Sequence, residues 1–184
     1  MKALTLGAFA LALALPLVGH AADYAVQPAQ SKLGFTSNFQ GTAFDGSFAK
    51  WTAAISYDPA NPATDKFDVT VDLASVHTGD KDRDGALPGA DFFNTAKFPQ
   101  AHFVTTGFRK NGTQVIADGN LTLRGVTKPV SLTVVFAPAG AGATLDVSGT
   151  VKRLDFGVGS GDYADTSVIG ADVKINAHLV LAAK

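Results

Sequence analysis

The chain has 184 residues, with 15 Lys and Arg against 16 Asp and Glu and a formal net charge of −1. No basic stretch stands out, which argues against a nucleic acid as partner, because nucleic-acid binding relies on clustered positive charge. The absence of cysteine excludes disulfides and thiol chemistry.

The first element along the chain is a short apolar run. Lys2 precedes the uncharged stretch ALTLGAFALALALPLV, and Gly19 and Ala21 form a small-x-small cleavage site. This is the layout of a secretory signal peptide. A retained anchor is the alternative, but the run is short for a membrane span, which needs about 20 apolar residues. We therefore expect residues 1–21 to be a signal peptide and residues 22–184 to form one domain.

Alternation of apolar and polar residues dominates the rest of the chain. In KFDVTVDLASV, every second residue from Phe67 to Leu73 is apolar. Period two with one apolar face predicts half-buried antiparallel strands, and Asn111-Gly112 is a strong hairpin signal. Strands are expected at residues 23–28, 31–39, 46–57, 66–76, 101–109, 113–124, 127–136 and 143–154, with a further one at 171–182.

Many short strands without a linker predict an all-β sandwich or barrel. Closure protects sheet edges best, so we expect an antiparallel β-barrel of about eight strands, whose interior is filled by side chains or holds one small ligand. The one helical piece is DFFNTAK, residues 91–97, before Pro99. Phe92 and Phe93 lie side by side on it and must cover something apolar. They are either a structural cap or the mouth of a ligand cavity.

Catalytic groups do not converge in the sequence. His77, His102 and His178 are scattered and show no metal-ligand spacing. Ser160 lies in GVGSG, which is not the G-x-S-x-G motif of hydrolases. Nothing favours an enzyme, and we expect a protein without catalytic activity or metal cofactor.

The run DKDRDGALPGAD, residues 80–91, is close to the calcium-loop pattern D-x-D-x-D-G-x5-E. Asp80, Asp82 and Asp84 could supply oxygen ligands. Against calcium, a strand precedes the run, Asp91 is shorter than the usual glutamate, and neighbouring basic residues reduce the negative charge. A calcium-stabilised extracytoplasmic structural domain is therefore the alternative function, and a solvated acidic loop is the simpler interpretation.

Several ordered motifs carry a resemblance to a known family. TGDKDRDGALPGADFFNTAKFPQAHF (78–103) contains T-G, R-D, D-F-F and K-F-P, and is followed by GNLTLRGVTKPVSLTV (119–134) and RLDFGVG (153–159). Together with the opening segment 31–59, these resemble the YceI-like family of periplasmic polyisoprenoid-binding domains. The match covers essentially all of the chain after residue 21. Because Arg83, Asp84 and Asp91 are family positions, the family motif produces half of the calcium pattern by itself, which favours coincidence.

The resemblance implies a lipocalin-like barrel with an elongated apolar cavity, a periplasmic location, and a bound isoprenoid lipid such as a polyprenyl phosphate or an isoprenoid quinone. Its polar head should stay near the mouth. We expect Phe35 and Phe48 to line the cavity and Phe92 and Phe93 to cap it. Phe39 and Phe156 complete the expected ligand contacts, although each of these rings could also be ordinary core.

Two departures from the family pattern bear on the head group. Gly85-Ala86-Leu87 stands where many members have a His-Leu pair, and SNFQGTAF lacks a second histidine found in many members. The ending GSGDYADTSVIGADVKI resembles a branch that is often linked to a di-haem membrane cytochrome, which makes a quinone more attractive by association. A homodimer is compatible with the sequence.

Overall fold

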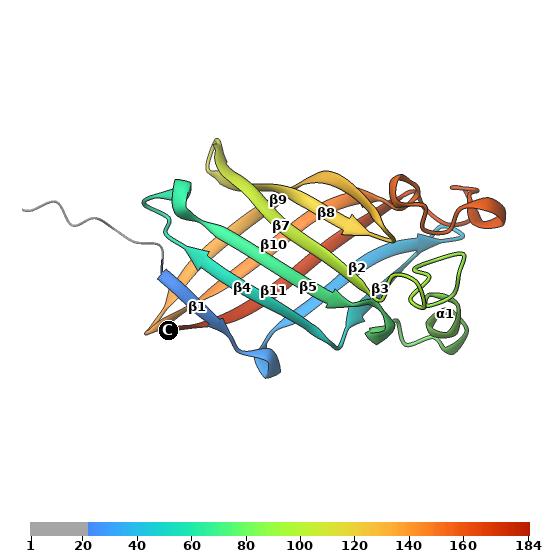
Figure 1. The fold of residues 1–184 in the computed structure, drawn as a ribbon, viewed down its shortest axis with the longest axis horizontal. Helices are drawn as coiled ribbons and strands as arrows, with labels where there is room; N and C mark the ends of the chain where they lie inside the picture. The colour runs from blue at the N-terminus through green and yellow to red at the C-terminus, as the bar shows by residue number, and fades with distance from the viewer. Residues whose placement is uncertain (1–21) are drawn as a thin grey trace, which may run out of the picture.

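The computed structural model describes residues 22–184, so the expected signal peptide lies outside the described residues. This part of the chain forms eleven strands and one α-helix, α1 (Lys81–Ala86) (Figure 1). The strands are β1 (Ala22–Val26), β2 (Lys32–Phe39), β3 (Thr42–Phe48), β4 (Trp51–Tyr57), β5 (Lys66–Asp72), β6 (Val76–His77), β7 (Gln100–Asn111), β8 (Gln114–Leu123), β9 (Val126–Ala139), β10 (Gly142–Lys152) and β11 (Asp172–Ala183). Short 3-10 helices are η1 (Pro28–Gln30), η2 (Pro62–Thr64), η3 (Leu73–Ser75), η4 (Arg153–Phe156) and η5 (Gly161–Tyr163). Among the described residues, no helix is long and apolar enough to cross a membrane.

Eight strands close into an antiparallel barrel in the order β1-β4-β5-β7-β8-β9-β10-β11, with β1 pairing back onto β11. Strand β11 is shared: its C-terminal part pairs with β1, and its N-terminal part pairs with β2, where Ile175 faces Phe35. Strand β2 pairs onward with β3, and Phe48 of β3 faces Val76 of β6. The expected all-β barrel is confirmed, and β2, β3 and β6 extend its wall at the end where α1 lies (Figure 1).

Three local expectations are wrong. The strand expected at 66–76 ends at Asp72, because the Asp72 side chain accepts from Ala74 N and caps η3. The strand expected at 46–57 is broken between β3 and β4, because Ala49 N and Lys50 N donate to the carbonyl and the hydroxyl of Ser75 and turn the chain towards η3. The helix expected at 91–97 is a series of turns instead. Asn94 there has a left-handed φ of 51°, which interrupts a helix. The helix lies earlier, at α1, where the Asp80 side chain caps the Arg83 N–H at 2.9 Å.

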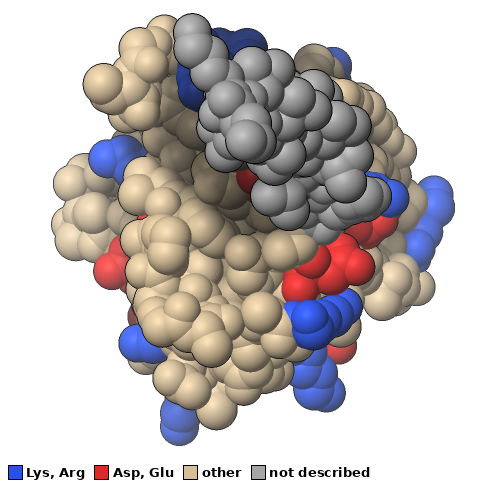
Figure 2. Space-filling model, turned by 90° about the vertical axis from the view of Figure 1, so that its left-hand side faces the viewer, with Lys and Arg blue, Asp and Glu red and all other residues tan. Residues whose placement is uncertain are grey.

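The end of the barrel where β1 begins is filled by aromatic side chains. The ring of Tyr57 lies 6.0 Å from that of Phe67, 6.1 Å from that of Phe108 and 4.7 Å from that of Phe136, between ring centroids. Burying each such side chain contributes about 1.5–3 kcal/mol. Seen from this end, most of the surface outside the grey atoms is uncharged, and Lys and Arg lie mainly at its periphery (Figure 2). The aromatic cluster therefore closes this end of the interior.

Asp65, between η2 and β5, provides a pH-dependent test of the fold at this end. Its Oδ1 accepts a hydrogen bond from Asp58 N at 2.6 Å, and its Oδ2 is buried without a partner among residues 22–184. Burial raises the pKa of Asp65 from 3.8 to about 6, and the Asp58 charge adds to the rise. The folded state therefore holds this proton more tightly than the unfolded state.

We predict that the stabilising contribution of protonated Asp65 is present below pH 3.8 and is lost as the pH rises to about 6. The substitution Asp65→Asn keeps an acceptor and removes the titration. As the pH rises over this range, the free energy of unfolding of Asp65→Asn, measured by urea denaturation, should increase relative to that of wild type. Parallel stability profiles for the two proteins between pH 4 and 7 would contradict the assignment.

Candidate ligand-binding cavity

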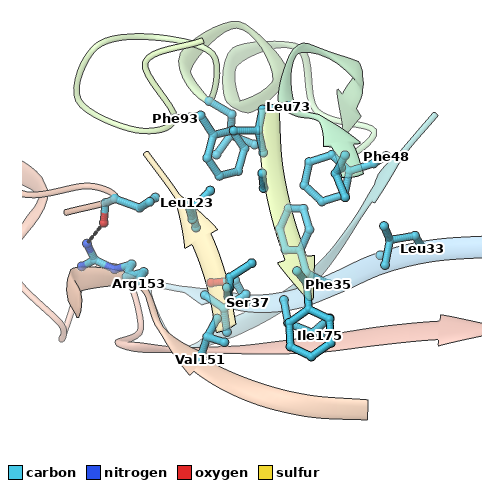
Figure 3. Close-up of a pocket in the computed structure, with 18 of the residues that line it drawn as sticks. Leu33, Phe35, Ser37, Phe48, Leu73, Phe93, Leu123, Val151, Arg153 and Ile175 are labelled. Carbon is cyan, nitrogen blue, oxygen red and sulfur yellow. Dashed lines mark hydrogen bonds between the residues drawn. The ribbon is translucent and has the colours of Figure 1, made fainter. Parts of the chain in front are cut away.

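An apolar cavity of about 660 Å³ runs through the barrel from the aromatic cluster to the α1 end. Its walls follow from the period of the strands: alternate residues point inward, such as Val69 and Val71 of β5 and Leu121 and Leu123 of β8. Figure 3 shows Leu123, Val151, Phe35 and Ile175 from different strands around the same space. A cavity of this size and character suits an apolar ligand.

Aromatic side chains stack between the cavity wall and its cap. The ring of Phe35 on β2 lies 5.7 Å from that of Phe48 on β3, and Phe48 lies 6.2 Å from Phe93, between ring centroids (Figure 3). Phe93 is fixed by its backbone N–H, which donates to Leu87 O at 3.0 Å. The turns after α1 therefore form the cap, and they hold Phe93 over the cavity.

Five of the six aromatic residues expected at the ligand line this cavity, namely Phe35, Phe39, Phe48, Phe92 and Phe93. Phe156 does not line it; it is 2% exposed and packs in the adjacent core. The cavity is also lined by aromatic residues that were not among the expected contacts: Phe44, Trp51, Phe67, Phe103 and Tyr163. The alternation in KFDVTVDLASV could have identified Phe67, because it shares a strand face with Val69 and Val71.

Arg83 lies at the mouth beside the cap. Its guanidinium carbon is 4.0 Å from the centroid of the Phe44 ring, which is a cation–π contact. Its Nε donates to Thr78 Oγ1 at 3.1 Å, and its Nη2 lies 3.8 Å from Asp80 Oδ2. Within residues 22–184 the Nη groups make no hydrogen bond, so they remain available to a polar group at the mouth.

Two other arginines hold the loops of the mouth through backbone carbonyls. Arg153 is 4% exposed, and its five N–H groups donate to five carbonyls between Val158 and Gly170. Burial lowers the pKa of this guanidinium. Arg124 donates to Ala90 O at 2.6 Å and to Gly157 O at 2.5 Å. Arg153 lines the cavity but has no donor left for a ligand, so its role is to fix the loop.

The acidic run 80–91 does not form the loop that calcium requires, because residues 81–86 are helical. Asp80 caps the helix, whereas Asp84 accepts hydrogen bonds from Thr78 N and Oγ1, each at 2.7 Å, and contacts His77 Nδ1 at 2.7 Å. These carboxylates point to different partners. Across residues 22–184, no three His, Cys, Asp or Glu side chains gather to hold a metal.

The comparisons with known proteins fit this architecture. The family model described as the YceI-like domain matches residues 24–181. The chain belongs to the YceI-like family. The protein YceI of Escherichia coli O157:H7 is 40% identical over 119 residues, which are 61% of this chain and 62% of that protein. The aligned part of the chain thus spans less than two thirds of that relative.

Several solved structures share this fold. BcnA of Burkholderia cenocepacia is 34% identical, with a TM-score of 0.81 over 85% of this chain and 99% of that one. The YceI protein of Campylobacter jejuni is 25% identical, with a TM-score of 0.70 over 97% and 99%. A domain from Saccharophagus degradans described as polyisoprenoid-binding is 20% identical, with a TM-score of 0.67 over 89% and 99%, and shows the fold alone.

The anchor of α1 provides a prediction for the cap. Hydrogen bonds from Thr78, together with the contact with His77, hold the pKa of Asp84 below its ordinary value of 3.8. The ionised Asp84 carboxylate therefore stabilises the folded state above pH 3.8, and this contribution is lost as the pH falls through the lower folded-state pKa. We expect Asp84→Asn to loosen α1 and the cap already at neutral pH, seen as faster amide hydrogen exchange in residues 81–98.

The matched control is Asp82→Asn on the same helix. Within the described residues the Asp82 side chain makes no hydrogen bond, so this change should leave the exchange of residues 81–98 as in wild type. Equal hydrogen-exchange rates in the two variants would show that Asp84 does not anchor the cap.

Proposed function

We propose that the barrel binds a long isoprenoid lipid in its cavity and carries or sequesters it in the periplasm. The observation that carries this proposal is the apolar cavity of about 660 Å³, which opens at a capped mouth. An isoprenoid is a chain of branched apolar units, so its affinity would come from apolar area removed from water, at about 25 cal/mol per Å² before the costs of binding. The polyisoprenoid-binding description of a structural relative supports this ligand class.

Arg83 is the residue we assign to the polar head. Its Nη groups, of which Nη2 also pairs with Asp80 at 3.8 Å, can donate to a phosphate oxygen or to a quinone carbonyl, so both ligand classes fit. Asp82 and Asp162 also line the mouth and would disfavour a highly charged anion. This arrangement, together with the C-terminal resemblance, favours an uncharged head such as a quinone.

The proposed role is binding without catalysis. His102 and His178, expected as scattered residues, each pair with one aspartate, Asp68 at 2.7 Å and Asp146 at 2.6 Å. The first pair joins β7 to β5 and the second joins β11 to β10, and within residues 22–184 neither belongs to a cluster of three or more such side chains. Export of the chain, a functional link to a membrane cytochrome and a homodimer stay predictions.

Trp51 offers a direct assay, because it is the one tryptophan of the sequence and it lines the cavity. A quinone inside the barrel should quench its fluorescence in a saturable way. We predict that Phe93→Ala, which removes the ring between the cap and Phe48, weakens binding of a long-chain isoprenoid quinone by about tenfold. A fluorescence titration measures the affinity, and urea denaturation measures the stability of the same variant.

Phe156→Leu is the control, because Phe156 is core without lining the cavity. It should lower the free energy of unfolding by about 1 kcal/mol or more while leaving the affinity unchanged. If Phe93→Ala lowers stability to a similar extent but retains wild-type affinity, the ring is plain core and the assignment fails.

A further inference from the structure

Exposed apolar side chains gather at one end of the molecule. Six large apolar residues are exposed in residues 22–184, and five of them lie at strand ends and in loops around the mouth. These five, called the apolar rim below, are Phe39 (42% exposed), Val126 (36%), Leu154 (36%), Tyr163 (43%) and Val168 (38%). The sixth, Val135, is 57% exposed on β9, away from the mouth. An exposed apolar group that surrounds an opening indicates an interaction surface.

The hydrogen bonds of the mouth loops place the rim residues together. Phe39 forms a bridge with Ile169, next to Val168. Arg153 binds the carbonyl of Tyr163, which joins the η5 segment to η4, where Leu154 lies. Arg124, two residues before Val126, binds the carbonyls of Gly157 and Ala90 and so ties the β8–β9 turn to η4 and to the cap.

The rim is continuous with the cavity. Phe39, Tyr163 and Val168 line the cavity as well as facing solvent, and the ring of Tyr163 stacks on that of Phe92 in the cap, 4.9 Å between centroids. Val126 and Leu154 face solvent without lining the cavity. An apolar path therefore leads from the outer surface into the barrel.

Acidic and basic side chains are equal in number in the lining of the cavity. The acidic residues that line the cavity are Asp82 and Asp162, and the arginines are Arg83 and Arg153. Electrostatic binding to anionic lipids requires clustered Lys and Arg side chains, and within residues 22–184 the lining of the cavity at this end has no such cluster. Any surface that the rim contacts must be held by apolar insertion.

We propose that the apolar rim docks on the surface of a lipid bilayer, so that an isoprenoid passes between the membrane and the cavity without crossing water. The proposal rests on the proposed lipid-binding function. Crossing water would expose the apolar lipid chain, which is unfavourable in proportion to its apolar area. Tyr163 and the neighbouring apolar side chains suit the level of the lipid head groups, where amphipathic aromatic rings collect.

The test compares two surface variants. Val126→Ser with Leu154→Ser removes rim side chains that do not line the cavity, and Val135→Ser removes an exposed apolar side chain elsewhere. Phosphatidylcholine vesicles carrying a long-chain isoprenoid quinone are mixed with the protein as purified from cells, and quenching of Trp51 reports uptake. All variants share the same N-terminus, so any contribution of residues 1–21 is common to all.

We expect the rate of quinone uptake from vesicles to fall at least about tenfold in the rim variant. The rate of Val135→Ser should match that of wild type. Uptake by wild type should change little with added salt. Both variants should bind quinone delivered from detergent with wild-type affinity. Equal rates in the rim variant and the Val135→Ser control would overturn the proposal. If the double variant does not fold, Leu154→Ser alone serves in its place.

A failure of the lipid-binding function can be distinguished from a failure of membrane docking. If wild type takes up quinone neither from vesicles nor from detergent, the lipid-binding function fails. Flotation of the protein with lipid vesicles that lack quinone then decides the docking alone. Weaker flotation of the rim variant than of Val135→Ser supports docking, and equal flotation overturns it.

Discussion

The pairing of β1 with β11 is the constraint on which the rest of the structure depends. It closes eight strands into one ring, so that every second side chain of each strand is directed into a common interior. Strand β1 covers only the C-terminal part of β11. The N-terminal part of β11 therefore pairs with β2, which brings Phe35 to the cavity. The same closure therefore produces a filled end and a hollow end.

The division of the interior follows from side-chain volume. Near the start of β1, the rings of Tyr57, Phe67 and Phe108 meet one another. Towards α1, smaller branched residues face each other across the barrel and the aromatic rings lie at the wall and in the cap. Arg124 and Arg153 hold the mouth loops through hydrogen bonds to backbone carbonyls, and within residues 22–184 neither pairs with a carboxylate.

Alternation in the sequence predicted the antiparallel strands and, together with the need to protect sheet edges, it favoured a closed barrel over a sandwich. It could not place the helix, because a left-handed Asn94 and a cap at Asp80 are decided by the packing of the turns. Nor could it separate Phe93 from Phe156. Both rings come from loops, and only the three-dimensional path of η4 turns Phe156 into the core.

Native mass spectrometry of the protein, purified from the cell without detergent, shows whether the cavity holds an isoprenoid lipid. We expect an added mass that matches a prenyl lipid, that is lost on organic extraction, and that returns after incubation with isoprenoid-loaded vesicles. A bare protein mass that persists after incubation with those vesicles would contradict this expectation.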